Sequence, residues 1–282
     1  METIHLPEEF QKIALKARAA GKKIALVTTM GNLHDGHASL IDIARKNADL
    51  VAVSVFVNPT QFAPNEDYDK YPRTLKADEK LCAEHGADIV FAPAPDAIYA
   101  KDASTFVVEN ACSQGLCGRY RPTHFRGVCT VVNLLFNLAQ PNVAVFGQKD
   151  AQQVAVLKRM VRDLHIPVEI IVAPIVREGD GLALSSRNKY LSARERAVAP
   201  QICAGLNAVK CAVSEGVVDV AKARKIFEEA LHANPLFETQ YFECVDATTM
   251  SQLSEIVPRE TLVAVAVFMT ETRTRLIDNI RV

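Results

Sequence analysis

The chain lacks the features that mark a protein bound to nucleic acid or to a membrane. Its 282 residues carry a formal net charge of −1 and no block of five like charges, which argues against an electrostatic surface for nucleic acid or anionic lipid. No apolar run approaches the roughly 18 residues that a membrane helix needs. The N-terminus also lacks the basic and then apolar layout of a signal peptide. We therefore expect a cytoplasmic globular protein without nucleic-acid or membrane partners.

The cysteines and serines form none of the usual chemical signatures. The seven cysteines are an odd number without a C-x-x-C pair, so they fit reduced thiols that pack as small apolar residues. Cys112 and Cys117 could form half of a metal site, but no second pair at ligand spacing follows. A G-x-S-x-G nucleophile elbow is also missing. The sequence therefore predicts no disulfide framework, no metal-ligand set and no enzyme nucleophile.

An alternation of strand and helix patterns fills the chain up to about residue 175. Apolar runs of strand length occur at 23–27, 50–57, 88–92, 143–146 and 168–172, with a weaker one at 105–108. Helical patterns lie between them, at 7–20, 38–47, 75–84, 130–138 and 151–164. This alternation is typical of a doubly wound, Rossmann-like α/β domain, whose parallel sheet binds ligands at the carboxyl ends of its strands.

The pattern changes beyond residue 190. Two helices are predicted at about 193–214 and 219–233, followed by apolar strands at 240–245, 262–269 and 275–281. With 49% hydrophobic residues, the chain can bury a full core and is long enough for two domains. We predict a Rossmann-like domain over 1–175 and a smaller α+β lid domain over 176–282.

Residues 28–37 carry the strongest chemical signal, T-T-M-G-N-L-H-D-G-H, where a strand pattern joins a helix pattern. Gly31 and Gly36 suit a tight turn that lets another group approach the backbone. A helix N-terminus at such a turn offers unpaired N–H groups and the positive end of the helix dipole, which suit a phosphate. His34 and His37 are three residues apart and can reach the same point. Two surface histidines at an ordinary helix start remain the plainer alternative.

Two further segments that follow predicted strands offer polar groups to a small ligand. In F-V-N-P-T-Q-F, the amide of Gln61 can donate and accept together, which suits a carboxylate beside a hydroxyl, although a polar turn explains it equally. In F-G-Q-K-D, Gly147 allows close backbone approach and Lys149 offers a point charge for phosphate. Asp150 can cap the next helix or hold a ribose hydroxyl.

Two cationic segments complete the candidates. Ser185, Ser186 and Arg187 lie in a glycine-containing loop and could close as a phosphate clamp over a bound nucleotide. Residues 119–127, R-Y-R-P-T-H-F-R-G, gather several cations. They could face substrate anions or form a solvated surface, and the sequence does not favour either reading.

Five motifs in series resemble the pantothenate synthetase (pantoate–β-alanine ligase) family, within the nucleotidyl-transfer superfamily that carries an H-x-G-H motif. They run from residue 28 to about 192 and read T-T-M-G-N-L-H-D-G-H, F-V-N-P-T-Q-F, Y-P-R-T, F-G-Q-K-D-A-Q-Q and L-S-S-R-N-K-Y-L-S. The chain has Ala63 and Gln148 where this family often has Gly and Glu. Both departures concern local loop geometry.

The resemblance implies a reaction and its substrates. ATP-dependent condensation of (R)-pantoate with β-alanine would give pantothenate, AMP and pyrophosphate through a pantoyl adenylate, with Mg²⁺ accompanying the ATP. It also implies a homodimer. Such a reaction needs no enzyme nucleophile, because the carboxylate of pantoate attacks the α-phosphorus itself; catalysis rests on positioning and on stabilising charge. The 1–175 domain would bind ATP and pantoate, and the 176–282 domain would carry the Ser-Ser-Arg loop at its start.

The resemblance also implies the site residues. His34, His37, Lys149 and Arg187 would be catalytic. Gln61 and Gln153 would hold pantoate, and Gln61 would also contact β-alanine. The ATP site would comprise Met30, Gly31, Asn32, Leu33, His34, Asp35, Gly36, His37, Gly147, Gln148, Lys149, Asp150, Val176, Leu184, Ser185, Ser186 and Arg187.

Two other functions are weighed against this one. An adenylyltransferase that joins AMP to a phosphorylated small molecule would share the histidine and Ser-Ser-Arg motifs, but not N-P-x-Q-F, and would never consume an amine. A catalytically idle RNA-binding relative of the aminoacyl-tRNA synthetases is disfavoured by the near-zero charge and by the lack of an anticodon-type domain. AMP release with and without pantoate and β-alanine distinguishes these functions.

Overall fold

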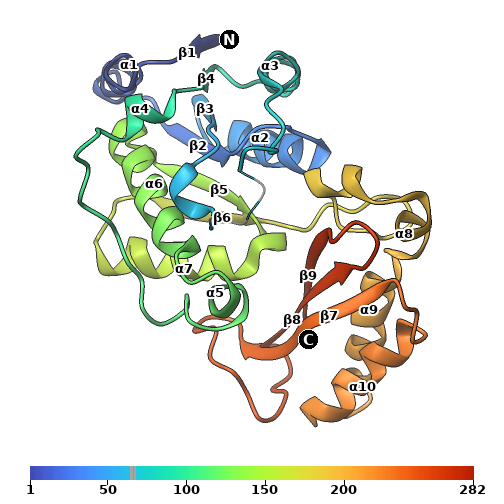
Figure 1. Cartoon of the computed structure of the whole chain (residues 1–282). Coiled ribbons are helices and arrows are strands. Elements are labelled where there is room, and N and C mark those ends of the chain that lie inside the picture. The colour runs from blue at the N-terminus through green and yellow to red at the C-terminus, as the bar shows by residue number, and fades with distance from the viewer. Residues whose placement is uncertain (64–65, 67) are drawn as a thin grey trace. The chain divides into compact units, whose positions relative to one another are not determined.

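The chain divides into two compact units in a computed structural model that describes residues 1–63, 66 and 68–282 (Figure 1). Unit 1 comprises Met1–Asn110, Arg121–Gln148 and Val156–Pro174, and unit 2 comprises Ala111–Tyr120, Lys149–Ala155 and Ile175–Val282. Two segments that precede residue 175, 111–120 and 149–155, thus group with the C-terminal residues, so the two units differ from those of a single cut after residue 175. The binding roles predicted for 1–175 and 176–282 stay predictions.

Among the described residues, unit 1 is built on a six-stranded sheet in which every neighbouring pair is parallel. The spatial order is β1 (Glu2–Ile4), β4 (Ile89–Phe91), β3 (Leu50–Val55), β2 (Ile24–Thr29), β5 (Val143–Gly147) and β6 (Glu169–Ala173). The chain extends the sheet from β2 through β3 to β4 and then crosses back to β5 on the other side of β2. This reversal confirms the doubly wound fold, and ligands bind such sheets at the carboxyl ends of the strands beside the reversal.

Helices cover both faces of this sheet (Figure 1). Ala25 packs in one apolar cluster with residues of α2 (Asp35–Asn47) and α3 (Leu75–Glu84). Its neighbour Ile24 packs instead with α1 (Pro7–Ala19), because successive side chains of a strand point to opposite faces. The other helices that belong wholly or partly to this unit are η1 (Pro59–Gln61), α4 (Pro95–Ile98), α6 (His124–Ala139) and α7 (Ala151–Asp163).

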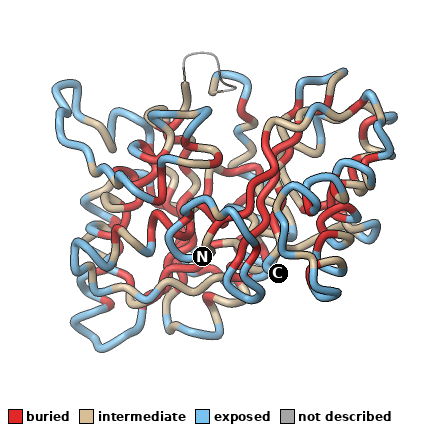
Figure 2. Tube along the Cα trace, turned by 90° about the horizontal axis from the view of Figure 1, so that it is seen from below, coloured by how far each residue is buried: buried red, intermediate tan, exposed pale blue. Residues whose placement is uncertain are grey.

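Unit 2, all of whose residues are described, has a three-stranded antiparallel sheet. Its order is β7 (Phe237–Asp246), β8 (Thr261–Met269) and β9 (Arg275–Arg281). Side chains from α9 (Gln201–Ser214) and α10 (Val220–Ala230) join strand residues in one buried apolar cluster. Figure 2 shows buried residues concentrated along the strands and exposed ones on loops and outer helix faces. The α+β class predicted for the smaller part is confirmed.

The structure corrects the predicted strand at 105–108, which has no regular secondary structure and pairs with no strand in the described ranges. Val107 donates its N–H to Oγ1 of Thr130 on α6 at 3.0 Å. The guanidinium of Arg126, also on α6, lies 4.7 Å from the ring centre of Phe106. Contacts with a helix thus replace the strand pairing that these β-branched and aromatic residues favour.

Three smaller differences concern the helices and the N-terminus. The helix predicted at 193–214 is divided into α8 (Ala193–Val198) and α9, because Pro200 lacks the N–H that would continue the helical hydrogen bonds. Helix α6 begins at His124 rather than near residue 130, so part of the cationic segment is helical. The short edge strand β1 was not predicted. None of the helices in the described ranges is long and apolar enough to cross a membrane.

Candidate active site

The histidine-bearing turn leaves the carboxyl end of β2 with a sharp change of direction. Gly31 and Asn32 both have positive φ angles, of 85° and 52°. A Cβ on Gly31 would lie 3.1 Å from Oδ2 of Asp78 and 3.1 Å from Cγ1 of Val55. Both the backbone conformation and the available space therefore favour glycine at this position.

His34 and His37 cap the helix that they begin. The N–H of Gly36 donates to Nδ1 of His34 at 3.2 Å, and the N–H of His34 donates to Nδ1 of His37 at 3.3 Å. Each Nδ1 is an acceptor, so a neutral imidazole here carries its proton on Nε2. The ring centres lie 4.2 Å apart. The turn thus holds two adjacent imidazoles that can each donate from Nε2 to a phosphate oxygen.

Several backbone N–H groups of this turn are paired, contrary to what the sequence predicted. Those of Asn32 and Leu33 donate to the carboxylate of Asp78 at 3.1 and 2.8 Å. That of His37 donates to the carbonyl of His34 at 2.7 Å. The imidazoles, rather than these amides, are therefore the groups that the turn offers to a phosphate, together with the positive end of the α2 dipole.

Gln61 is held in contact with Met30 beside the end of β2. It lies in η1, the next element after β3, and is only 8% exposed. Nδ2 of Asn58 donates to Oε1 of Gln61 at 3.1 Å, and Nε2 of Gln61 lies 2.9 Å from the sulfur of Met30. The structure thus brings together two sequence-predicted residues and adds Asn58, which sequence reasoning left in its motif without a role.

Helix α6 packs directly on η1 at Gly127. A Cβ on Gly127 would lie 2.5 Å from the carbonyl oxygen of Thr60 and 2.6 Å from the backbone nitrogen of Gln61. Nδ2 of Asn58 also donates to the carbonyl of Gly127 at 3.1 Å. The glycine is needed for close approach of two backbones, and this approach sets the position of Gln61.

The cationic segment is engaged in contacts within the chain. Arg121 contacts both carboxylate oxygens of Glu66, at 2.5 and 2.6 Å, and Nδ1 of His124 lies 3.0 Å from the carbonyl of Gln61. Burial raises the pKa of Glu66, but the Arg121 guanidinium, the N–H of Ala63 and the nearby His124 together hold that pKa below its ordinary value. Arg119 pairs with the buried Glu243. The segment is therefore no simple solvated surface, and Arg121 and His124 support the Gln61 loop.

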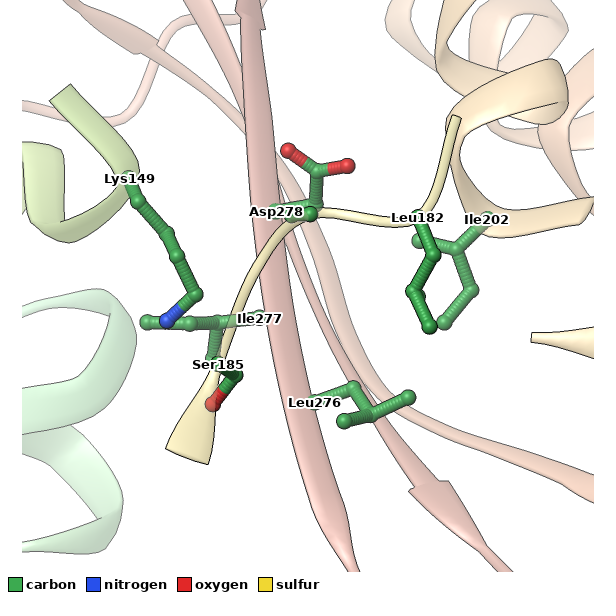
Figure 3. A pocket seen from close by; sticks show the side chains of 8 residues that line it. Lys149, Leu182, Ser185, Ile202, Leu276, Ile277 and Asp278 are labelled. Carbon is green, nitrogen blue, oxygen red and sulfur yellow. The ribbon is translucent and has the colours of Figure 1, made fainter. Parts of the chain in front are cut away.

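Lys149 and Ser185 line one small cavity of unit 2 (Figure 3). Lys149 reaches toward this cavity from the helical turn that follows β5, and Ser185 from the loop before η3 (Ser186–Tyr190). The other residues that line the cavity are Leu182, Ala183, Ile202, Leu276, Ile277 and Asp278. An ammonium group and a hydroxyl over an apolar floor suit a ligand with a charged and an uncharged part.

Strand β9 anchors both parts of this cavity. Nδ2 of Asn279 donates to the backbone carbonyl of Lys149 at 3.0 Å. Asp278, its neighbour, binds the guanidinium of Arg177 through both carboxylate oxygens, at 2.6 and 3.0 Å. Arg177 in turn donates to the carbonyl of Gly181 at 3.1 Å. The last strand of the chain therefore fixes the base of the loop that carries Ser185.

The remaining sequence-predicted residues are divided between the units. Unit 1 contains Gln61 and unit 2 contains Gln153, so the two residues predicted to hold pantoate belong to different units. The predicted ATP residues of unit 1 are Met30, Gly31, Asn32, Leu33, His34, Asp35, Gly36, His37, Gly147 and Gln148. Those of unit 2 are Lys149, Asp150, Val176, Leu184, Ser185, Ser186 and Arg187.

Comparison with known proteins gives nearly full-length matches. A family model described as pantoate–β-alanine ligase matches residues 2–281. A pantothenate synthetase of Thermoanaerobacter sp. is 49% identical over 272 residues, which are 96% of this chain and 95% of that protein. The crystal structure of a pantothenate synthetase from Thermus thermophilus matches with a TM-score of 0.92 and 43% identity, covering 100% of this chain and 99% of that one.

A further solved structure carries ligands. It is a pantoate–β-alanine ligase from Francisella tularensis in complex with β,γ-ATP and β-alanine, and it matches with a TM-score of 0.81 and 32% identity, over 100% of this chain and 97% of that one. These matches confirm the resemblance indicated by the five motifs and the predicted ligase class. They span both units and all the motif positions, so the chain belongs to the pantoate–β-alanine ligase family.

Proposed function

We propose that this chain joins (R)-pantoate to β-alanine in an ATP-dependent reaction that yields pantothenate, AMP and pyrophosphate through a pantoyl adenylate. The observation that carries the proposal is the contact of Gln61 with Met30 beside the capped pair His34 and His37. A carboxylate-binding amide thus shares the carboxyl end of β2 with two phosphate-binding imidazoles, on a chain that belongs to this ligase family.

In the first half-reaction, a carboxylate oxygen of pantoate attacks the α-phosphorus of ATP, and the bond to pyrophosphate breaks. His34 and His37 donate from Nε2 to phosphate oxygens. These hydrogen bonds stabilise the negative charge that develops on the phosphates in the transition state. Gln61 and Gln153 hold pantoate so that its carboxylate faces the phosphorus. No proton needs to leave pantoate in this step, because the carboxylate is already ionised at neutral pH.

Residues of unit 2 neutralise the triphosphate. Lys149 supplies a point charge and Arg187 a planar guanidinium that can contact two phosphate oxygens. Ser185 and Ser186 add hydroxyl donors from the loop that closes over the nucleotide. The adenosine lies against Met30 and against the backbones of Gly147–Asp150 and Val176.

In the second half-reaction, the amine nitrogen of β-alanine attacks the carbonyl carbon of the adenylate. The carbon–oxygen bond to AMP breaks and the nitrogen loses one proton. Gln61 also contacts β-alanine and so serves both halves of the reaction.

Mg²⁺ is proposed to arrive with ATP. No group of three or more His, Cys, Asp or Glu residues in the described ranges is arranged to hold a metal ion. A magnesium ion that came with the nucleotide would not need such a group, because Mg²⁺ in nucleotide sites is usually held by phosphates, water and only one or two carboxylates. When bound, the ion offsets phosphate charge. The predicted homodimer and cytoplasmic location stay predictions, which the mass of the protein in solution and cell fractionation would test.

The proposed function is tested by the dependence of AMP release on each substrate. We expect stoichiometric AMP and pantothenate only when ATP, pantoate and β-alanine are all present. AMP transfer to a phosphorylated acceptor, without consumption of an amine, would instead establish the adenylyltransferase alternative. Labelled pyrophosphate should also exchange into ATP when pantoate is present and β-alanine is absent, because the adenylation step is reversible. A requirement for β-alanine would argue against an adenylate formed first.

Replacement of Gln61 by alanine is expected to weaken pantoate binding chiefly. The buried groups that Gln61 satisfies would be left unpaired, which costs about 1–3 kcal/mol and raises the KM for pantoate roughly 5- to 150-fold. Steady-state kinetics at saturating ATP measure this, and the exposed Gln252 offers a control in Gln252→Ala. An unchanged pantoate KM with loss of ATP affinity would show that the assignment is misplaced.

Replacement of Gly127 by alanine is expected to displace the segment that carries Gln61, because Gly127 packs against the backbone of that segment. The added methyl group cannot fit against the backbone atoms of Thr60 and Gln61 at 2.5 and 2.6 Å, so α6 and η1 must separate. We expect a loss of about 1–3 kcal/mol in the free energy of unfolding and a higher pantoate KM. Thermal melts and kinetics measure both, with Gly179→Ala as a control, because a Cβ there meets nothing within 4 Å. Normal values for Gly127→Ala would contradict this packing argument.

A further inference from the structure

A buried carboxylate lies beneath the turn that leads to His34. Asp78, in the first turn of α3, is only 2% exposed. Its Oδ2 accepts the N–H of Asn32 at 3.1 Å and its Oδ1 accepts the N–H of Leu33 at 2.8 Å. The hydroxyl of Thr74 lies 3.2 and 3.3 Å from the two oxygens. Among the described residues, no basic side chain forms an ion pair with Asp78.

The charge of Asp78 is matched by backbone dipoles. The positive φ angles of Gly31 and Asn32 turn successive N–H groups toward one point, a concave arrangement that binds anions. The N-terminal end of α3 contributes the positive end of its dipole at the same carboxylate. Hydrogen bonds from such donors to an ionised carboxylate are about twice as strong as those between neutral groups. A buried aspartate without a cationic partner is therefore a stable feature here.

The same carboxylate is linked to both histidines through the backbone. Leu33, whose N–H it accepts, directly precedes His34, and the N–H of His34 donates to Nδ1 of His37. Gly31 also packs closely against this carboxylate, because a Cβ added to Gly31 would lie only 3.1 Å from Oδ2 of Asp78. A shift of the turn would break these contacts, and each imidazole accepts a backbone N–H of the turn or of the helix start through Nδ1.

We propose that Asp78 is a positioning residue for adenylation. Its carboxylate fills the anion-binding concavity of the turn, so the phosphates of ATP are kept off the amides of Asn32 and Leu33. The phosphates contact the Nε2 atoms of His34 and His37 instead. The turn, with the Asp78 carboxylate bound in it, holds these two imidazoles in place. This inference rests on the proposed function, because it assigns Asp78 to the first half-reaction of that scheme.

The test separates the two half-reactions in Asp78→Asn, which keeps the size of the side chain and removes its charge. We expect pyrophosphate–ATP exchange in the presence of pantoate to fall about 10- to 100-fold, as is usual when a partner that orients a functional group is lost. The reaction of preformed pantoyl adenylate with β-alanine should change less than about threefold, because no triphosphate takes part in it. Glu84→Gln, an exposed carboxylate on the same helix, should leave both rates unchanged.

Chemical rescue distinguishes positioning from a purely structural role. In Asp78→Ala the concavity loses its carboxylate, and added formate can supply one to the same two N–H groups. We expect formate to restore a substantial part of the exchange rate, and neutral formamide of similar size to restore none. Circular dichroism melts of both variants show whether the fold survives at the assay temperature.

Three outcomes would overturn the inference. These are normal exchange in Asp78→Asn, an equal loss of both half-reactions in a folded variant, and equal effects of formate and formamide on Asp78→Ala. Failure of the wild-type protein to exchange pyrophosphate or to form pantothenate would instead overturn the proposed function. The wild-type assay therefore tells the two failures apart.

Discussion

Replacement of Lys149 by alanine is expected to lower kcat about 10²- to 10³-fold, or about 3–4 kcal/mol in transition-state stabilisation, by analogy with the loss of one oxyanion donor. The ammonium group lines the unit 2 cavity, and no carboxylate in the described ranges forms an ion pair with it. Its charge is therefore available to a phosphate. The backbone contact with Asn279 at 3.0 Å does not involve the Lys149 side chain, so the variant should keep the fold.

Steady-state kinetics and a thermal melt of the purified variant measure this expectation. Lys149→Arg keeps the charge and should retain more activity than Lys149→Ala, although its geometry differs. Lys158→Ala removes an exposed lysine from α7, the helix that follows Lys149 in the chain, and should leave turnover unchanged. Near-normal turnover of a folded Lys149→Ala variant would remove this residue from the catalytic set.

Replacement of His37 by alanine is expected to abolish pyrophosphate–ATP exchange. His37 lies at the positive end of the α2 dipole and presents Nε2 to the phosphates, so its effect should fall on adenylation. Preformed pantoyl adenylate should still react with β-alanine at a substantial rate. The loss of Nδ1 also removes an acceptor for the N–H of His34, which costs about 1 kcal/mol of stability as the loss of a helix cap does.

His37→Asn provides the matched control for that capping role. The amide oxygen of asparagine can accept the N–H of His34 near the place of Nδ1, but the side chain has no donor at the position of Nε2. We expect this variant to melt close to the wild type and still to lack exchange. Equal loss of both half-reactions in a folded variant would mean that His37 also serves the amine step, and a lowered melting temperature would indicate collapse of the site.

The central strands of unit 1 were predictable, because a strand that is buried on both faces has a nearly continuous run of apolar residues. β2 and β3 read as mostly apolar runs; all of β2 except Thr28 is buried, as is all of β3 except its two ends. The same reasoning failed at 105–108, where the N–H of Val107 and the ring of Phe106 contact α6 instead of another strand. Such a pattern reports that a segment is extended and partly apolar, and only the tertiary structure decides whether it pairs with another strand.

The two imidazoles of the turn were predictable from local spacing, whereas the distant residues that hold the turn and Gln61 in place were not. His34 and His37 are close in sequence, so their proximity follows from helix geometry. Leu33 and Asp78 are 45 residues apart, and Gln61 and His124 are 63 residues apart. No periodicity links such pairs, and Asp78 alone looks like an ordinary acidic residue in the first turn of a helix. The backbone amides predicted to bind phosphate were therefore assigned without the carboxylate that occupies them.

The division of the chain into units has a consequence for folding during synthesis. Segments 111–120 and 149–155 belong to unit 2 and leave the ribosome well before strands β7, β8 and β9 are made. The pairing of Arg119 with Glu243, 124 residues later, must wait for most of the chain, and contacts at such separation form slowly. Unit 1, whose last strand β6 ends at Ala173, can form first. Until β9 emerges, the nascent chain carries an unfinished unit 2 whose apolar segments are exposed and prone to aggregation.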